Sequence, residues 1–430
     1  MSTYFAEHAW LSGGVADNVR ITVHSGRFAA IETGAAQPGD EWLPGLVLPG
    51  FANTHSHAFH RALRGRTHDA DGTFWTWRRR MYAVAERLDP DSYLALARAT
   101  FAEMALAGVT SVGEFHYLHH AAGGRRYDDP NAMGRALIEA ARQGGIRITL
   151  LDACYLSGGL GDAPLNVTQQ RFSDGSATAW AERVADLRGD ANTNVGAAIH
   201  SVRAVPREEI PLVVAAAAGP LHVHVSEQLA ENHECMRVYG LTPTALLHEA
   251  GALGPDTTAV HATHVSADDI ALLGGTRTHV AFCPTTERDL ADGIGPARAL
   301  RDAGAPLTLG SDQHAVIDLL EEARALEMHE RLSTGRRGRF SPSQLLDALT
   351  GQHALGWPDA GRIEPGARAD LVAVRLDTVR TAGSDPAQAL LAASAADVDT
   401  VLVDGRAVVR DGQHALGDVA TLLHDAISAL

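Results

Sequence analysis

Lysine is absent from the chain: all 36 Lys+Arg residues among the 430 are arginine. A phosphate-binding P-loop, a Schiff-base or pyridoxal enzyme and a two-metal hydrolase bridged by a carboxylated lysine all require that amine. The sequence therefore excludes these chemistries. A GC-rich coding bias, which also favours Ala, Gly and Arg, is the simplest explanation of the absence, and the exclusions hold whatever its cause.

Cysteine, excess positive charge and long apolar runs are also scarce. Cys154, Cys235 and Cys283 are isolated, so neither a disulfide framework nor a thiolate zinc site is favoured. A formal net charge of −16 without a basic block argues against nucleic acid and anionic membranes as partners. No stretch approaches the roughly 18 apolar residues of a membrane span, and the first residues do not resemble a signal peptide. We expect a cytoplasmic protein.

Short apolar, β-branched runs recur along the chain, and each is followed by a loop and a longer amphipathic stretch. This spacing predicts an α/β fold of the (β/α)₈ barrel type. The eight predicted strands are 46–53, 109–115, 146–153, 195–200, 221–225, 258–262, 279–283 and 306–309. The predicted helices include 90–107, 131–143, 177–187, 207–218, 243–249 and 318–333.

The two flanks of the chain have a different pattern, with short alternating strands and turns that contain glycine. Examples are 21–25, 370–375, 400–403 and 407–410. We expect residues 1–45 and 362–430 to meet in one small β-sandwich-like domain, and residues 46–361 to form the barrel.

Polar residues follow several of the predicted strands, and a barrel of this kind carries its chemistry at the carboxyl ends of its strands. The first run leads into His55 and His57, whose i, i+2 spacing on an extended segment directs both side chains to the same side. The eighth run ends at Asp312. A lone His-x-His pair is a weak signal, but its position at a strand end favours a metal site.

The fifth and sixth runs add further candidates. The fifth contains His222 and His224 and is followed by Glu227, while the sixth leads to His261 and His264. Three histidines and one carboxylate from strands one, five and eight would leave a coordination position open for water, which is typical of a catalytic metal. Spacing alone leaves open which histidine of each pair takes part.

With these features the sequence resembles the amidohydrolase superfamily, specifically its deaminase branch with one metal. The similarity extends to the flanks, where GARADLV (366–372) and VLVDGR (401–406) resemble the family's closing strands. The resemblance implies a divalent metal, zinc or alternatively Fe²⁺, Ni²⁺ or Co²⁺, on His55, His57, His224 and Asp312. It also implies Glu227, His261 and Asp312 as catalytic residues. His224 is preferred to His222 as the third ligand, and His261 is preferred to His264 as the catalytic histidine. The fourth strand contains no lysine, so we expect one metal and no carbamate-bridged pair.

More detailed matches resemble one enzyme of that branch, which releases ammonia from the formimino group of a dicarboxylate. They are NTHSHAFHRAL (53–63), FWTWRRRMY (74–82), EFHYLHH (114–120) and HSVRAV (200–205). The resemblance implies a small dicarboxylate substrate that is bound by His60, Arg78, Tyr117, His200 and Arg203. Arginine suits that task because its planar fork binds a carboxylate through two hydrogen bonds.

Three points stay open on the sequence alone. Arg78 could belong to a solvated helix face, and His60 and Gln313 replace the glutamine and serine expected from the resemblance. Guanine, a related purine or a thioadenosine is an alternative substrate of the same branch, and an inactive metal-binding barrel is the alternative outside enzymes. We also expect a homodimer.

Overall fold

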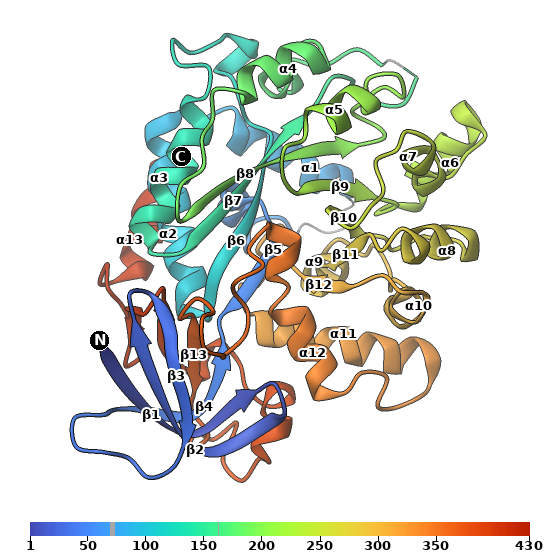
Figure 1. Cartoon of the computed structure of the whole chain (residues 1–430). Helices are drawn as coiled ribbons and strands as arrows, with labels where there is room; N and C mark the ends of the chain where they lie inside the picture. The colour runs from blue at the N-terminus through green and yellow to red at the C-terminus, as the bar shows by residue number, and fades with distance from the viewer. Residues whose placement is uncertain (69–73, 162) are drawn as a thin grey trace.

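The computed structural model describes residues 1–68, 74–161 and 163–430, which form two eight-stranded sheets (Figure 1). The barrel strands lie side by side in chain order, and every pairing between them is parallel. These strands are β5 (Phe51–Ser56), β6 (Val109–His116), β7 (Arg147–Cys154), β8 (Thr193–Ser201), β9 (Leu221–Val225), β10 (Thr257–His261), β11 (His279–Phe282) and β12 (Leu307–Leu309). The predicted (β/α)₈ architecture is therefore confirmed.

Helices follow the strands and cover the outside of the barrel (Figure 1). They are α1 (Phe74–Ala85), α2 (Pro90–Leu106), α3 (Ala132–Gly144), α4 (Ala177–Val184), α5 (Ile210–Ala216), α6 (Leu229–Tyr239), α7 (Pro243–Glu249), α8 (Ala267–Gly275), α9 (Pro284–Asp289), α10 (Ala297–Ala303), α11 (Leu319–Thr334) and α12 (Pro342–Leu349). Local sequence explains where several of them begin. Asp89 and Ser92 form a capping box around Pro90 at the start of α2, and Asp318 caps α11.

Both ends of the chain contribute to the second sheet, which lies below the barrel in Figure 1. Its order is β16-β15-β14-β13-β4-β1-β2-β3. The strands are β1 (Ser2–Leu11), β2 (Gly14–His24), β3 (Arg27–Thr33), β4 (Glu41–Pro49), β13 (Leu371–Val374), β14 (Val398–Val403), β15 (Arg406–Arg410) and β16 (Gln413–His414). The last helix, α13 (Val419–Ser428), packs against α2 of the barrel. The expectation that the two flanks meet is confirmed.

The predicted first barrel strand, 46–53, is wrong because this run is divided between the two sheets. Residues up to Pro49 belong to β4 and pair with β13, so the boundary predicted at 45/46 falls inside a strand of the terminal sheet. The chain crosses to the barrel at Gly50, where a Cβ atom would lie 2.4 Å from the Thr110 hydroxyl. Residues 46–49 and the first two residues of β5, Phe51 and Ala52, are buried and apolar, so the hydrophobic pattern did not mark the crossing.

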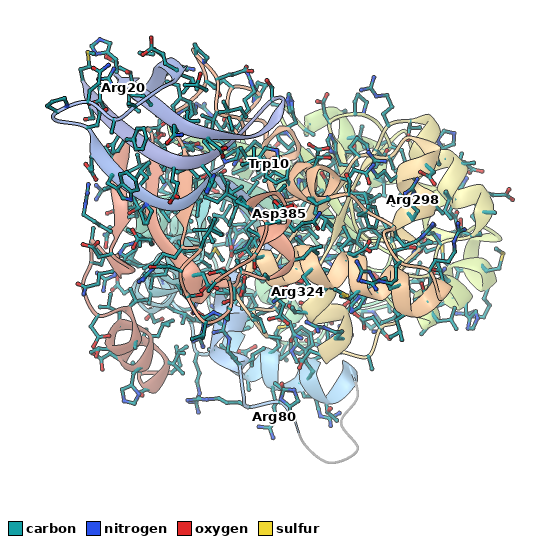
Figure 2. The ribbon with its side chains drawn as sticks, turned by 90° about the horizontal axis from the view of Figure 1, so that it is seen from below. Trp10, Arg20, Arg80, Arg298, Arg324 and Asp385 are labelled. Atoms are coloured by element: carbon teal, nitrogen blue, oxygen red, sulfur yellow. The ribbon has the colours of Figure 1, made fainter. Side chains whose placement is uncertain are left out.

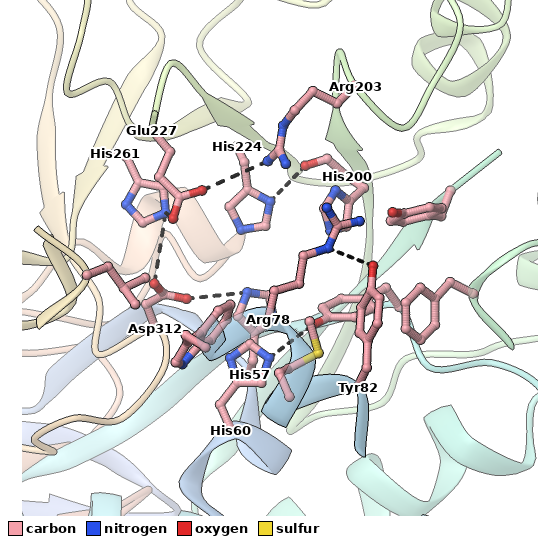
Figure 3. Close-up of a pocket in the computed structure, with 16 residues that line it drawn as sticks. His57, His60, Arg78, Tyr82, His200, Arg203, His224, Glu227, His261 and Asp312 are labelled. Atoms are coloured by element: carbon pink, nitrogen blue, oxygen red, sulfur yellow. Dashed lines mark hydrogen bonds and ion pairs between the residues drawn. The ribbon is translucent and has the colours of Figure 1, made fainter. Parts of the chain in front are cut away.

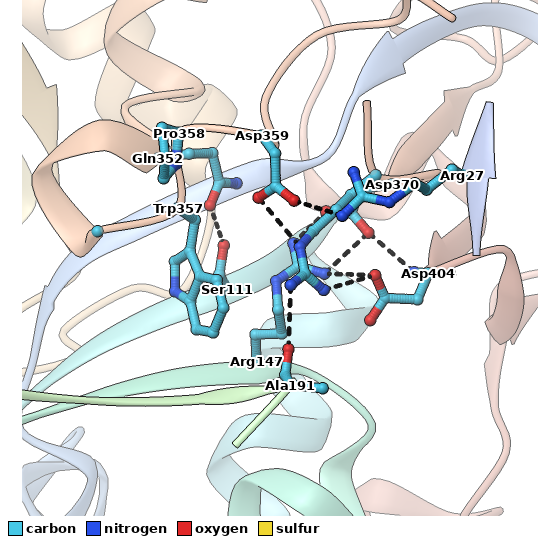
Figure 4. Close-up of polar contacts among 12 residues, drawn as sticks. Arg27, Ser111, Arg147, Ala191, Gln352, Trp357, Pro358, Asp359, Asp370 and Asp404 are labelled. Atoms are coloured by element: carbon cyan, nitrogen blue, oxygen red, sulfur yellow. Dashed lines mark hydrogen bonds and ion pairs between the residues drawn. The ribbon is translucent and has the colours of Figure 1, made fainter. Parts of the chain in front are cut away.

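A buried ion pair joins the two sheets near this crossing (Figure 4). Arg147 begins β7, and its guanidinium donates to both carboxylate oxygens of Asp370 in the terminal sheet, one of them at 3.0 Å. Asp404 accepts from Arg147 at 3.3 Å, and its own backbone N–H donates to Asp370 at 2.9 Å. The Arg147 guanidinium also lies 5.5 Å from the centre of the Trp357 ring. The terminal sheet is thus attached to the bottom of the barrel by charge as well as by apolar packing.

Arginines of two outer helices, Arg324 and Arg298, which are labelled in Figure 2, donate to backbone carbonyls of later segments. Arg324 of α11 donates to the Ala393 carbonyl, between β13 and β14, at 3.0 Å. Arg298 of α10 donates to the Arg339 carbonyl at 2.6 Å. Within the described residues, no helix is long and apolar enough to cross a membrane.

Asp370→Asn should destabilise the protein, because it leaves the buried Arg147 guanidinium without its main counter-charge. Removing one partner of a buried pair typically costs about 3 kcal/mol or more. Chemical denaturation followed by circular dichroism measures this loss. Asp377→Asn is the matched control, since Asp377 pairs with Arg375 at the surface and its replacement should hardly move the midpoint. Equal midpoints for the two variants would contradict a role for the Arg147–Asp370 pair.

Candidate active site

The four predicted metal ligands lie together at the carboxyl ends of β5, β9 and β12. The Nε2 atoms of His55 and His224 are 3.1 Å apart, and those of His55 and His57 each lie 3.4 Å from Oδ1 of Asp312. All four side chains are buried, and their potential ligand atoms lie within 4.8 Å of one another. The structure therefore brings together three imidazoles and one carboxylate that could hold a metal ion.

Hydrogen bonds and burial prepare the imidazoles for this task. Nδ1 of His57 donates to the Phe115 carbonyl at 2.9 Å, and Nδ1 of His224 donates to the His200 carbonyl at 2.7 Å. These bonds leave the Nε2 lone pairs directed into the cluster. Burial lowers the pKa of His57 and His224, and it lowers the pKa of His55 to about 3. Neutral imidazoles are the form that binds a divalent ion, so the donor set fits one.

Glu227 and His261, the two predicted proton-handling residues, lie beside Asp312. Nε2 of His261 is 3.9 Å from a carboxylate oxygen of Glu227 and 3.9 Å from one of Asp312 (Figure 3). His261 and Asp312 have φ values of 72° and 41°, and Ser226, the residue before Glu227, has a φ of 52°. Left-handed backbone of this kind is unfavourable for residues other than glycine and is concentrated at functional sites.

The electrostatic environment separates the roles of these two groups. Burial raises the pKa of Glu227, which favours its protonated form. Burial lowers the pKa of His261, but Glu227, Glu287 and Asp312 outweigh this effect and raise it to about 10. Glu287 of α9 lies 3.5 Å from the other ring nitrogen of His261. A carboxyl that holds its proton more tightly than usual and an imidazole that favours its cationic form therefore lie side by side next to Asp312.

All five predicted substrate-binding residues line the pocket above this cluster: His60, Arg78, Tyr117, His200 and Arg203 (Figure 3). His60 and Tyr117 form a pair in which the imidazole Nε2 is 2.9 Å from the phenol oxygen. The His200 ring centre lies 5.3 Å from that of Tyr117. Burial lowers the pKa of His60 well below its ordinary value, so it offers a neutral ring where glutamine was expected.

Both arginines of the pocket are held by neighbouring side chains. Arg203 donates through Nε to Glu231 at 2.7 Å, and Arg78 donates through Nε to the Tyr82 hydroxyl at 2.8 Å. Arg78 therefore faces the pocket, whereas its neighbours Arg79 and Arg80 are exposed. The alternative of a solvated helix face describes those two neighbours and not Arg78.

The competing residues point elsewhere. Nε2 of His222 donates to the Ala354 carbonyl at 3.0 Å, and Nε2 of His264 donates to the Asp292 carbonyl at 2.8 Å. Gln313 donates to Asp289 at 2.7 Å. None of the three lines the pocket.

A second buried group of possible metal ligands consists of His116, His119 and Asp152. The carboxylate of Asp152 already accepts two hydrogen bonds from Arg183, at 2.8 and 2.9 Å. The cation beside this carboxylate is thus supplied by the protein, so the group is less suited to a metal ion than the cluster at the strand ends.

Sequence reasoning missed several residues of the pocket wall. Tyr155 directly follows β7, so the rule that polar strand-end residues are functional would have found it. Tyr82 lies one helical turn beyond Arg78, a spacing at which side chains meet. Phe172 ends a short 3-10 helix and Leu290 directly follows α9, and neither carries a comparable signal.

Comparisons with known proteins agree with this geometry. A model of the amidohydrolase family matches residues 46–408, and a model described as the N-terminal domain of formimidoylglutamate deiminase HutF matches residues 1–43. Formimidoylglutamate deiminase of Pseudomonas aeruginosa is 38% identical over 444 residues, covering 96% of this chain and 96% of that protein. The 8-oxoguanine deaminase of the same organism is 32% identical over 394 residues, covering 88% and 85%. The crystal structure of an amidohydrolase from Brucella melitensis has a TM-score of 0.93 and 31% identity, covering 100% of this chain and 99% of that one.

Beneath the candidate metal group lies a buried carboxyl, Glu114, whose charge depends on pH. It accepts from the Ser56 hydroxyl at 2.6 Å and from the Ala58 backbone N–H at 2.7 Å. Burial raises the pKa of Glu114 from 4.5 to about 8, although both hydrogen bonds oppose the shift. Between these values the folded protein binds more protons than the unfolded chain, so stability must fall as the pH rises through this window.

Glu114→Gln should flatten this pH dependence, because its amide can donate to Ser56 and accept from Ala58 without a charge. We expect the wild type to lose on the order of 3 kcal/mol more than the variant between pH 5 and 8.5. Urea denaturation at several pH values measures the difference. Glu139→Gln is the control, since Arg142 and Gln143 lower the pKa of Glu139 to about 2 and keep it ionised throughout. Parallel pH profiles for wild type and Glu114→Gln would contradict the assignment.

Proposed function

The chain belongs to the amidohydrolase family, and from this premise we propose that it hydrolyses N-formimidoyl-L-glutamate to N-formyl-L-glutamate and ammonia. The observation that carries the proposal is one pocket in which a candidate metal group lies opposite two arginines from different elements. The match of residues 1–43 to a domain of formimidoylglutamate deiminase and the 38% identity to that enzyme support it independently.

We assign one divalent metal, zinc by preference, to His55, His57, His224 and Asp312. A bound ion of this kind polarises the reacting group and makes water a competent nucleophile near neutral pH. The His57 and His224 hydrogen bonds to backbone carbonyls would keep both rings oriented toward it. The absence of lysine is consistent with one metal and not a carbamate-bridged pair.

The protein's own groups then divide the proton transfers. Asp312 accepts a proton from the attacking water, and His261, which lies 3.9 Å from Asp312, stabilises the negative charge that develops during attack. Glu227, whose pKa burial raises, donates a proton to the departing nitrogen. Water adds to the formimino carbon and the bond to the terminal nitrogen breaks. That nitrogen leaves as ammonia after it takes one proton from Glu227 and the proton that Asp312 removed from water, and the hydroxyl proton of the adduct returns to Glu227 as the formamide forms.

Arg203 and Arg78 supply the positive charge for a substrate with two carboxylates. They enter the pocket from the end of β8 and from α1, so each can bind a different carboxylate. His60, Tyr117 and His200 form a polar wall that can contact the remainder of the substrate. A neutral purine needs no such pair of cations, which favours the dicarboxylate over the purine and thioadenosine alternatives.

Purified protein should release ammonia from formimidoylglutamate and contain about one metal ion per chain. The test measures ammonia with formimidoylglutamate, 8-oxoguanine, guanine and methylthioadenosine in parallel, together with metal content on the same sample. Removal of the ion by a chelator should abolish turnover, and added zinc should restore it. Preferential turnover of a purine, or undiminished activity in protein free of metal, would overturn the proposal.

Glu227→Gln should lower kcat at least about 100-fold while the metal content stays unchanged. The amide keeps the size of the side chain but cannot transfer a proton, and such transfers contribute roughly 10²–10⁴-fold. Steady-state kinetics and metal analysis of the same preparation check both parts. Glu234→Gln, at a partly exposed position of α6 next to Arg237, serves as the control and should behave as wild type. A Glu227→Gln enzyme with near-normal kcat would exclude Glu227 as the proton donor.

A further inference from the structure

Glu231 is a buried acid next to the pocket that the proposed chemistry does not use. It lies in the first turn of α6 and is only 3% exposed. One of its carboxylate oxygens accepts from Nε of Arg203 at 2.7 Å. The other accepts from the backbone N–H of Ser226 at 3.2 Å. A single carboxylate therefore contacts both the end of β8, which carries Arg203, and the end of β9, which leads to Glu227.

The contact with Arg203 determines how that arginine faces the substrate. The Glu231 carboxylate accepts the hydrogen bond from Nε of Arg203. A terminal nitrogen of the same guanidinium lies 3.9 Å from a carboxylate oxygen of Glu227, which lines the pocket (Figure 3). An arginine side chain has many rotamers, so a fixed fork must be held by a partner. Of the two carboxylates that Arg203 contacts among the described residues, that of Glu231 is the nearer one.

The contact with Ser226 acts on the other side of the site. Ser226 has a φ of 52°, a left-handed conformation that is unfavourable for a residue with a side chain. The turn is held from two directions, because the Ser226 N–H donates to Glu231 and its carbonyl accepts from the His264 N–H at 3.0 Å. Glu227 is the next residue, so the conformation of Ser226 sets the direction of the proposed proton donor.

We propose that Glu231 is a positioning residue that couples substrate recognition by Arg203 to proton donation by Glu227. This inference rests on the proposed function for the roles of those two residues. Glu231 itself does not reach the reacting atoms. It acts on the reaction by fixing the distance between Arg203, which binds a carboxylate of the substrate, and Glu227, which protonates the leaving nitrogen.

Glu231→Gln is the sharpest single change, because both partners of this side chain are donors. An amide offers one oxygen and one NH₂ group, so it can accept from only one of them. Loss of the bond to Arg203 should raise KM, and loss of the bond to Ser226 should lower kcat. A hydrogen bond to a charged group corresponds to a change of about tenfold to a hundredfold in the affected constant.

A double-mutant cycle with Arg203→Met separates positioning from a merely structural role. A KM effect of Glu231→Gln should disappear when Arg203 is already absent, whereas a kcat effect that acts through Ser226 should persist. Glu231→Asp keeps the charge on a shorter stem and should recover part of the lost kcat/KM. It also replaces Glu231→Gln in the cycle if the latter does not fold. Glu234→Gln on the same helix is the matched control.

Metal content and thermal stability are measured on every variant. Wild-type kinetics in a fully loaded Glu231→Gln enzyme would overturn the proposal, as would a KM effect of equal size with and without Arg203. Failure of the proposed function would be visible separately, since the wild type would then not release ammonia from formimidoylglutamate. In that event the same cycle is measured with whichever tested compound the wild type deaminates.

Discussion

Closure of the barrel between its first strand and the segment after its last strand is the constraint on which the site depends. The backbone N–H groups of Ser311 and Asp312 donate to the His55 carbonyl at 3.1 and 3.0 Å, and that of His57 donates to the Asp312 carbonyl at 3.1 Å. Gly310 permits this approach, since a Cβ atom there would lie 2.7 Å from His55. Main-chain hydrogen bonds thereby fix the backbone of His55 and His57 against that of Asp312, which lies about 255 residues later in the chain. The relative positions of these three candidate ligands therefore do not depend on side-chain rotamers alone.

Arginine supplies positive charge at several buried places in this acidic chain. Arg147 joins the two sheets, Arg183 neutralises Asp152 beneath the pocket, and Arg203 is held at its wall. Each of these guanidiniums is buried or partly buried and donates to at least one carboxylate. Buried charge is stable only when its hydrogen bonds are satisfied, and the planar fork satisfies several at once. A protein without lysine can therefore place positive charge inside its fold.

The sequence was sufficient for those features that depend on local pattern or on position at a strand end. Seven predicted barrel strands and the strand-end candidates His55, His57 and Asp312 follow from such signals, whereas the choice of His224 over His222 depended on the family resemblance. The crossing at Gly50 could not be predicted, because the apolar end of β4 and the apolar first residues of β5 form one continuous buried run although they belong to different sheets. The pairing of Arg203 with Glu231 was equally hidden, since it joins residues 28 positions apart on different elements. Long-range partners of this kind depend on packing, which a single sequence does not reveal.

The terminal sheet has a consequence for how the chain reaches its folded state. β4 pairs with β1 on one side and with β13 on the other, so its second edge has no neighbour until residues near 371 have been synthesised. A strand edge left open in this way can pair with other chains. Contacts of such large sequence separation also slow folding. The same chain order that builds the sheet from both ends thus leaves β4 open to pairing with other chains during synthesis, and all eight barrel strands are synthesised before the residues that close that edge.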